Sequence, residues 1–286
     1  MARVAIVTGG GSGIGRALAD ALVRRGDVVV VADINGAAAA ATASGLRGAG
    51  PGTASAATVD VRDATGVAAL VDAAVDQHGR LDLMFNNAGI GIGGPVEELT
   101  CAHWDRIIDV NLRGVVHGVQ AAYPIMVEQG FGHLVNTASL AGLVPNPGTV
   151  PYVATKSAVV GLSLGLRMEG AAKGVRVSVV CPGVVDTPIL DAGMPADLPT
   201  VPSLARSDSR ALFNKVSRGR LMRPEALAAQ VLRGVDRNKA VIVAPRQAQV
   251  LWWLMRMSPA LAMRLTQSVM TQARADALRT NDIDHE

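Results

Sequence analysis

The sequence predicts a doubly wound α/β fold, in which a parallel sheet of about seven strands lies between two layers of helices. The first observation is a series of short apolar runs. They are β-branched and mostly continuous, as expected for strands buried on both faces. The second is that longer helical stretches separate these runs, which is typical of crossover connections between parallel strands. The predicted strands are 3–8, 28–33, 57–61, 81–87, 133–139, 175–181 and 240–245.

The predicted helices fill the intervals between these strands. An Ala-rich segment, 36–50, is interpreted as a surface helix without an assigned function. The longer helices are expected at 13–25, 64–78, 101–129 and 152–173.

The pattern weakens after the sixth strand. Segment 188–222 is rich in proline and polar residues, and we expect a mobile substrate loop with short helices there. A helix is expected to begin near Arg223, with Pro224 in its first turn, and a helical C-terminal tail is predicted over 246–280. Neither a linker nor a repeat divides the chain, so residues 1–286 are expected to form a single domain.

The composition argues against several classes of protein. Hydrophobic residues make up 49% of the 286 residues, which is enough for a sizeable core. The net charge is only +3 and no run of basic residues exceeds two, so no nucleic-acid partner is expected. Two isolated cysteines and five scattered histidines offer no metal-ligand spacing, so no metal is expected. The apolar run at the N-terminus is too short for a signal peptide, which predicts a cytoplasmic protein.

A glycine-rich turn follows the first strand, in the stretch TGGGSGIG from Thr8 to Gly15. Glycines there let the backbone approach a pyrophosphate, whose charge is favoured at the N-terminus of the next helix. Asp33 ends the second strand, 20 residues after Gly13, where a carboxylate can accept hydrogen bonds from an adenosine ribose. A carboxylate repels a 2′-phosphate and Ser12 offers no positive charge for one, so NAD is expected over NADP.

Six motifs in order resemble the classical short-chain dehydrogenase/reductase family. The resemblance is strong over 1–190 and weaker over 220–245, and it implies a Rossmann-type fold. The motifs are TGGGSGIG, Asp60-Val61, Asn86-Asn87-Ala88-Gly89, Asn111 in DVNLRG, Ser139 with Tyr152 and Lys156 in Y-x-x-x-K, and the segment from Pro182 to Thr187. The glycine turn and the resemblance together give the expected cofactor contacts: Gly9, Ser12, Gly13, Ile14, Gly15, Asp33, Asp60, Val61, Asn87, Ala88, Gly89, Tyr152, Lys156, Pro182, Gly183, Val185 and Thr187.

The expected activity is an NAD(H)-dependent interconversion of a secondary alcohol and a ketone. Tyr152 and Lys156 are one helical turn apart and share a helix face. A free Tyr titrates near pH ~10, so the Lys156 ammonium and the nicotinamide charge are expected to lower the pKa of Tyr152 and make it the general acid/base. Ser139 is expected to hold the substrate oxygen. The resemblance implies that Lys156 also holds the nicotinamide ribose.

Two further residues, Asn111 and Thr187, have two interpretations each. Asn111 either holds a water that connects Lys156 to solvent or satisfies a helix kink. Thr187 either contacts the carboxamide of the cofactor or caps the loop that follows. Asn86 is expected to support neighbouring strands, whereas Asn87, Ala88 and Gly89 line the adenosine side.

The substrate is expected to be neutral and hydrophobic, because the pocket candidates are mostly apolar. No Arg or Lys stands beside Ser139 or Tyr152 to capture a carboxylate. Besides Ser139 and Tyr152, the expected substrate contacts are Leu140, Val144 and Val185; further candidates that either line the pocket or pack the loop are Ala141, Leu143, Pro145, Ile189, Leu190 and Met194.

The apolar run 250–255 in the tail is too short to span a bilayer. It either packs on its own domain or a partner subunit, covers the substrate pocket, or lies in a membrane interface, which is the least favoured of the three. The resemblance implies a homodimer or homotetramer built through the helices at 101–129 and 152–173. The competing hypothesis for the function is a catalytically silent NAD(H)-binding regulator, which the presence of Ser139, Tyr152 and Lys156 disfavours.

Overall fold

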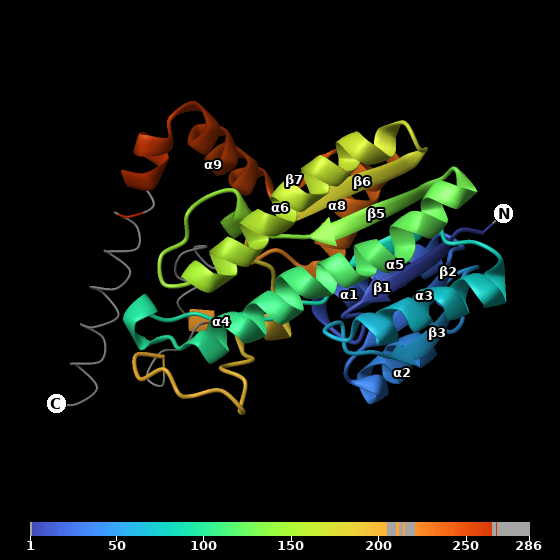
Figure 1. The fold of residues 1–286 in the computed structure, drawn as a ribbon, viewed down its shortest axis with the longest axis horizontal. Helices are drawn as coiled ribbons and strands as arrows, with labels where there is room; N and C mark the ends of the chain where they lie inside the picture. Colours follow the sequence, from blue (N-terminus) through green and yellow to red (C-terminus); the bar gives the residue numbers. More distant parts are fainter. Residues whose placement is uncertain (1, 205–209, 212–213, 215–220, 265–266, 268–286) are drawn as a thin grey trace.

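The computed structural model describes residues 2–204, 210–211, 214, 221–264 and 267. One seven-stranded parallel sheet lies between two layers of helices, which confirms the predicted fold class (Figure 1). The strand order is β3-β2-β1-β4-β5-β6-β7. The strands are β1 Val4–Thr8, β2 Val28–Asp33, β3 Thr53–Thr58, β4 Leu83–Asn86, β5 Gly132–Thr137, β6 Val175–Pro182 and β7 Val241–Ala244.

The helices form two groups that cover opposite faces of the sheet. Alternate strand residues point to opposite faces, so Val7 packs with the first group and Ile6 with the second. The first group is α1 Gly13–Arg24, α2 Gly36–Gly45 and α8 Pro224–Asp236. The second group is α3 Ala64–His78, α5 Gly114–Gln129 and α6 Val150–Ala171.

Further elements complete the fold at the carboxyl end of the sheet. They are η1 Val96–Glu98, α4 Cys101–Ile108, η2 Asp109–Arg113, η3 Leu140–Gly142, η4 Pro188–Leu190 and α9 Arg246–Met257. Figure 1 shows α4 and α9 at the end of the molecule toward which the strands point, with the N-terminus at the opposite end.

The third strand lies earlier than predicted. The sequence predicted 57–61, whereas β3 spans Thr53–Thr58. This strand is at the edge of the sheet and its side chains are mostly exposed, so its sequence lacks an apolar run. Val59 and Val61, which suggested the strand, are buried after it ends, in the core beneath α3 and α5.

The predicted helix at 101–129 is divided. It consists of α4, a π-helical turn at η2 and α5. Such turns are frequent at functional sites, and this one contains Asn111.

The C-terminal tail is helical from the residue predicted, 246. α9 ends at Met257, and residues 259–264 are again helical. The tail from 268 onward lies outside the described residues, as do most residues of the predicted substrate loop between 205 and 220. Within the described part of the chain, no helix combines the length and the apolar character needed to cross a membrane.

Candidate active site

The predicted cofactor and catalytic residues gather at the carboxyl end of the sheet. Strands β2 and β3 lie on one side of β1 and β4 to β7 lie on the other, so the order in which strands are added to the sheet reverses between β1 and β4. Open α/β sheets bind their ligands in the crevice outside such a reversal.

The loop between β1 and α1 has positions where only glycine fits. Gly9 has φ +64° and Gly13 has φ +50°, in the left-handed region that favours glycine. A Cβ on Gly9 would lie 2.9 Å from the Cα of Ala88, and one on Gly15 would lie 2.1 Å from the carbonyl O of Gly9. At Gly9 the loop therefore lies so close to the backbone after β4 that a side chain would not fit between them.

Ser12 is the N-cap of α1, and its side chain makes no cap hydrogen bond. The first N–H groups of a helix lack intrahelical partners and attract anions. Ile14, in the first turn, packs partly against the core. The start of α1 thus combines the backbone donors and the dipole that the sequence predicted for a phosphate.

Asp33 stands beside this loop at the end of β2. Its Oδ2 accepts a hydrogen bond from the backbone N–H of Gly11 at 2.9 Å, and its Oδ1 accepts one from the N–H of Asn35 at 2.9 Å. The carboxylate therefore has a fixed position next to the glycine loop.

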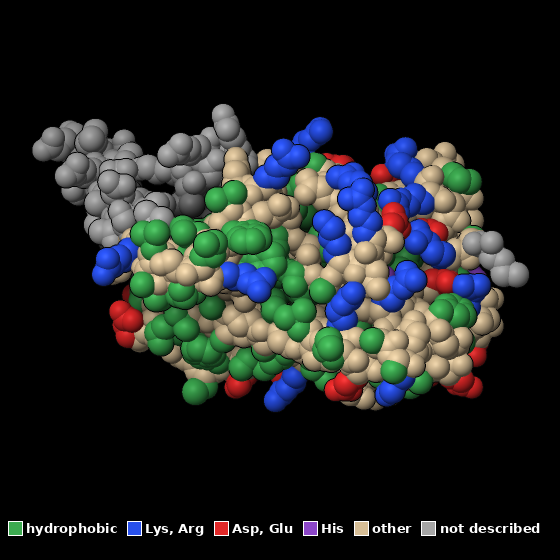
Figure 2. Space-filling view, turned by 90° about the horizontal axis from the view of Figure 1, so that it is seen from above, with side chains coloured by type: hydrophobic (Ala, Val, Ile, Leu, Met, Phe, Trp, Pro, Cys, Tyr) green, Lys and Arg blue, Asp and Glu red, His purple; other side chains and the backbone are tan. Residues whose placement is uncertain are grey.

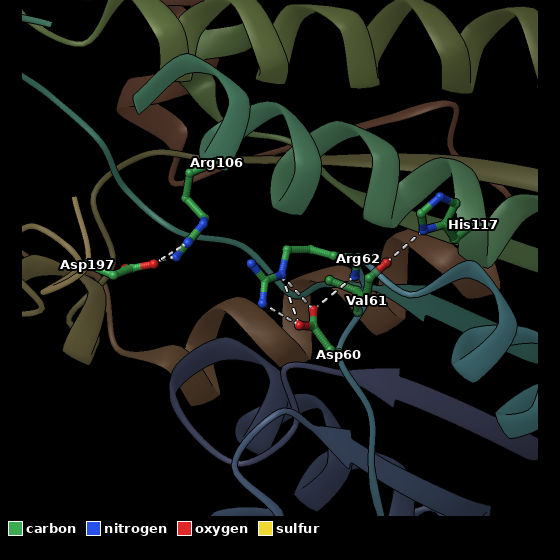
Figure 3. A network of polar contacts seen from close by, with 6 residues as sticks. All are labelled: Asp60, Val61, Arg62, Arg106, His117 and Asp197. Atoms are coloured by element: carbon green, nitrogen blue, oxygen red, sulfur yellow. Dashed lines mark hydrogen bonds and ion pairs between the residues drawn. The ribbon is translucent and has the colours of Figure 1, made fainter. Parts of the chain in front are cut away.

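Asp60 has a partner that the sequence did not predict. The Arg62 side chain binds both carboxylate oxygens of Asp60, with Nη2 at 2.5 Å from Oδ2, and the Arg62 N–H adds a bond of 3.0 Å to Oδ1 (Figure 3). These hydrogen bonds hold the pKa of Asp60 below its ordinary value. Next to this pair, the Nδ1 atom of His117 lies 2.8 Å from the carbonyl O of Val61.

The Thr8 side chain binds two backbone groups of the loop after β4. Oγ1 of Thr8 accepts hydrogen bonds from the N–H groups of Asn87 at 3.0 Å and Ala88 at 3.1 Å. The Asn87 amide donates to the carbonyl O of Thr8 at 3.0 Å. Asn86 points elsewhere and donates to the Asn136 amide O on β5 at 2.8 Å, which agrees with the strand-supporting role expected for it.

Ser139, Tyr152 and Lys156 come together between β5 and α6. The hydroxyl of Ser139 accepts a hydrogen bond from the N–H of Ala141 at 3.2 Å, and Ser139 lies close enough to the phenol of Tyr152 to act on its pKa. The Lys156 ammonium is buried and donates to the carbonyl O of Thr137 at 2.9 Å. Its Nζ lies 5.7 Å from the centre of the Tyr152 ring.

Burial changes the acidity of these groups in the free protein. It raises the pKa of Tyr152, with a smaller opposing effect from Ser139. The lowered pKa expected for Tyr152 also depends on the charge of a bound nicotinamide, so it stays a prediction. Burial also lowers the pKa of Lys156 to about 8. Both shifts have the same cause, because a low-dielectric surrounding disfavours any charged form.

Asn111 joins the π-helical turn to the loop after β4. Its Oδ1 accepts from the N–H of Ile90 at 2.8 Å, and its Nδ2 donates to the carbonyl O of Ile90 at 2.9 Å. A Cβ on Gly89 would lie 3.2 Å from the Asn111 Oδ1 and 3.4 Å from the Lys156 Nζ. Asn111 and Lys156 thus face the same glycine.

The segment after β6 passes over the glycine loop. The methyl group of Thr187 lies 3.2 Å from the position of a Cβ on Gly13, and the Thr187 hydroxyl donates to the carbonyl O of Val185 at 3.3 Å. Pro182 is buried at the end of β6. A Cβ on Gly183 would lie 3.3 Å from Cδ of Pro245.

The predicted pocket residues differ in how far the chain covers them, and three of the apolar ones are buried. Val144 and Val185 are 5% exposed and Leu190 is 9% exposed, whereas Ile189 is 41% exposed. Leu140 and Leu143 are partly buried against the core. Ala141 and Met194 have intermediate exposure, and Pro145 is exposed.

Polar contacts that the sequence did not predict tie down the following segment. Arg106 of α4 forms an ion pair with Asp197 (Figure 3), and Nε2 of His103 lies 3.0 Å from the carbonyl O of Pro199. Arg210 binds Asp186 and Asp191, with a distance of 2.5 Å in each pair.

Among the described residues, no group of three or more His, Cys, Asp or Glu side chains is arranged to hold a metal ion.

Comparison with known proteins identifies relatives over most of the chain. Residues 3–196 match the family model described as short chain dehydrogenase. Levodione reductase of Leifsonia aquatica is 38% identical over 194 residues, which are 67% of this chain and 73% of that protein. Cyclohexanol dehydrogenase of an Acinetobacter species is 41% identical over 189 residues, which are 66% of this chain and 75% of that protein.

Two solved structures have the same fold. A short-chain dehydrogenase/reductase from Burkholderia phymatum in complex with NAD superimposes with a TM-score of 0.80 and 33% identity, covering 91% of this chain and 95% of the other. A short-chain dehydrogenase from Sphingobium yanoikuyae in complex with NADPH gives a TM-score of 0.75 and 26% identity, covering 92% and 95%. With the family model matching more than half of its length, this chain belongs to the short-chain dehydrogenase family.

Proposed function

We propose that this protein is an NAD(H)-dependent oxidoreductase that interconverts a secondary alcohol and a ketone, with Tyr152 as the general acid/base. One observation carries the proposal. Ser139 lies close enough to the Tyr152 phenol to act on its pKa, and the Lys156 ammonium lies 5.7 Å from the centre of the Tyr152 ring. This cluster stands at the same end of the sheet as the glycine loop, so a substrate at Tyr152 and a cofactor on the loop would share one crevice.

The residues around the glycine loop fit a dinucleotide. A Cβ on Gly11 would lie 2.9 Å from Oδ2 of Asp33, so this part of the loop has no room for a side chain between backbone and carboxylate. The loop at Gly9, Gly13 and Gly15 would hold the pyrophosphate, and Asp33 would bind the adenosine ribose. Because a ribose 2′-phosphate would bring a second negative charge to Asp33, we propose NAD over NADP.

In the oxidative direction, Tyr152 would remove the hydroxyl proton of the alcohol, and in the reductive direction it would return a proton to the ketone oxygen. When bound, an oxidised nicotinamide would supply the hydride acceptor and a positive charge that favours the phenolate form of Tyr152. Ser139 would donate a hydrogen bond to the substrate oxygen and stabilise the charge that develops there. Lys156 would hold the nicotinamide ribose and contribute a second positive charge.

Asn111 would keep the proton path in place. Its side chain is occupied by Ile90, so its part in the chemistry would be to fix the loop at Gly89 next to the Lys156 ammonium. A water held at this position would connect Lys156 with solvent.

The proposed substrate is a neutral, fairly hydrophobic alcohol or ketone. Val144 and Val185 supply apolar walls, and the expected pocket candidates contain no cation for a carboxylate. Levodione reductase and cyclohexanol dehydrogenase, to which the chain is similar, carry names of uncharged substrates.

Replacing each of the two tyrosines tests the mechanism. Tyr152→Phe is expected to bind NADH as the wild type does, measured by cofactor fluorescence, and to lose about 10³-fold or more in kcat. Tyr123→Phe is the matched control, because the buried Tyr123 hydroxyl has no hydrogen-bond partner within the described residues. A Tyr152→Phe enzyme with near-normal turnover would show that another group carries the proton.

A further inference from the structure

We propose that α9 and the groove beside it form a surface that binds anionic lipid membranes, so that the protein attaches peripherally without crossing the bilayer. The observations come from the charge of the groove and from the exposed face of α9. Neither depends on the proposed function.

The groove lies between α8, β7 and α9 and has a volume of about 440 Å³. Its lining contains four cationic side chains and no acidic one, together with Trp252 and Trp253. The cations are Arg233, Arg237, Lys239 and Arg246. Figure 2 views the molecule from the side of α9, and its Lys and Arg side chains gather next to an area of hydrophobic ones.

None of these four cations forms an ion pair within the described ranges. Elsewhere the same residue types are paired, as in Arg3 with Asp27 and Arg80 with Asp82. The chain from Arg237 to Arg264 contains no Asp or Glu. The negative charge that complements this groove must therefore come from outside the described part of the protein.

The outer face of α9 is apolar at positions one or two turns apart. Val250, Trp253 and Met257 are 69%, 63% and 76% exposed, and their spacing of three and seven residues places them on one side of the helix. The opposite side packs on the domain through Ala248, which is 5% exposed, and Trp252. Leu261 and Met263, in the next helical residues, are each 47% exposed.

A basic groove beside an exposed Trp and Met matches an anionic lipid surface better than a second copy of this chain. In a two-fold dimer the same patch meets itself, and four cations without an acid would face four more. Phospholipid headgroups supply the missing negative charge, and the headgroup boundary takes up Trp and Met side chains. Arg256, which lies 5.3 Å from the Trp252 ring centre, can extend toward the headgroups from the same helix.

The position of this surface gives it a consequence for substrate access. α9 begins just after β7, at the end of the sheet where the candidate active site lies, and Ala248 is close to Gly183. Attachment through α9 would bring that end of the sheet near the bilayer, where hydrophobic alcohols and ketones dissolve. This consequence rests on the proposed function, whereas the attachment does not.

Vesicle flotation with the full chain tests the proposal. We expect the protein to float with vesicles of phosphatidylcholine and phosphatidylglycerol at 0.1 M NaCl, but not with phosphatidylcholine alone, and to be released at high salt. Replacing Arg237 and Lys239 by Gln should weaken partition about 25-fold, at about fivefold per charge. Replacing Trp253 and Met257 by Gln should weaken it at least tenfold.

The control variants replace an exposed apolar residue or an exposed cation by Gln on surfaces away from α9. Phe131→Gln removes an apolar side chain that is 38% exposed just before β5, at the opposite end of the sheet, and Arg47→Gln removes an exposed cation after α2. Both should float like the wild type. The proposal is overturned if the wild type ignores anionic vesicles or if the α9 and groove variants bind them equally well. It is also overturned if these variants change only the oligomeric mass in light scattering, which would assign this face to contact between copies.

Discussion

Burial sets the protonation of the two ionisable side chains at the centre of the candidate site. With the pKa of Lys156 near 8 and that of Tyr152 raised, the free protein at pH 7 holds a mostly charged ammonium beside a neutral phenol. A neutral phenol is the form that donates a proton, so under the proposed function the free site suits ketone reduction. Oxidation would then require the additional positive charge of the cofactor to make Tyr152 a base.

Individual residues differ in how far the sequence predicts them. The spacing of Tyr152 and Lys156 on one helix predicts that they are neighbours, but it does not give their burial, which decides the direction of the pKa shifts. Arg62 was missed because no spacing rule separates an Arg that binds Asp60 from a solvated one. The sequence predicted that Asn111 belongs to the site. It did not predict the hydrogen bonds of Asn111 with Ile90, because these depend on the π-helical turn.

Replacement of Asp33 by Asn tests the proposed preference for NAD. The change removes the charge that opposes a ribose 2′-phosphate, and it leaves one oxygen to accept from the N–H of Gly11 or Asn35, where Asp33 accepts from both. We expect the ratio of kcat/KM for NAD to that for NADP to fall at least tenfold, with NADP use rising. An equal loss with both cofactors would mean that Asp33 only fixes the loop.

Helices and strands were predictable from the sequence where one face of the element, or the whole element, is buried. α3 has the predicted bounds of 64 and 78, and α1 differs by one residue at its end. β3 was misplaced because an edge strand needs no apolar run. The π-helical turn was missed because the apolar pattern of 101–129 continues through it, and the extra residue in that turn depends on contacts with a distant loop.

The contact between β5 and β6 contains a buried histidine that predicts how stability depends on pH. Nε2 of His133 lies 2.8 Å from the Ser178 hydroxyl, which itself donates to the carbonyl O of Lys239 at 2.6 Å. Burial, followed by the charges of Arg176, Arg167 and Arg3, lowers the pKa of His133 from 6.5 to about 3. The unfolded chain therefore binds the proton more tightly, and stability is lost as the pH falls below 6.5.

Between pH 7 and pH 5 this group should cost about 2 kcal/mol of unfolding free energy, at ~1.4 kcal/mol per pH unit within the window. His133→Gln keeps a donor for Ser178 and does not titrate. Urea unfolding of the wild type and the variant at the two pH values isolates the contribution of His133, because all other titratable groups are the same in the two proteins. The stability gap between wild type and variant should narrow by about that amount at pH 5, and an unchanged gap would contradict the assignment.

The complete molecule brings four strand ends together that are far apart in the sequence. Thr8 holds Asn87 at 3.0 Å, Thr137 donates to the Asn87 amide O at 3.4 Å, and Thr187 packs on Gly13. Each of these residues follows or ends a different strand, so motifs that are ordered along the chain converge only because the sheet is parallel. The convergence was predictable from the fold class. The ties between Arg106 and Asp197 and around Arg210 were not, since they join segments without regular structure.

The family resemblance also predicts a homo-oligomer that assembles through α5 and α6. Two glycines on α6 allow this prediction to be tested. Gly161 and Gly165 lie one turn apart on α6, and a Cβ at either position would meet no atom within 4 Å. Leu164 and Met168 on the same helix are 38% and 79% exposed. Small residues allow another helix to approach closely, at a distance set by the side chains at the contact.

Gly165→Leu should therefore leave the protomer intact and block its partner. A Gly in a helix interior costs about 1 kcal/mol relative to Ala, so the variant protomer should be at least as stable in urea as the wild type. Light scattering should show the oligomer of the wild type replaced by monomer. Gly45→Leu, at the end of α2 where a Cβ also meets nothing within 4 Å, should keep the wild-type mass. A Gly165→Leu protein with unchanged mass would exclude this face of α6 from the assembly, because a leucine there cannot be accommodated beneath a closely packed helix.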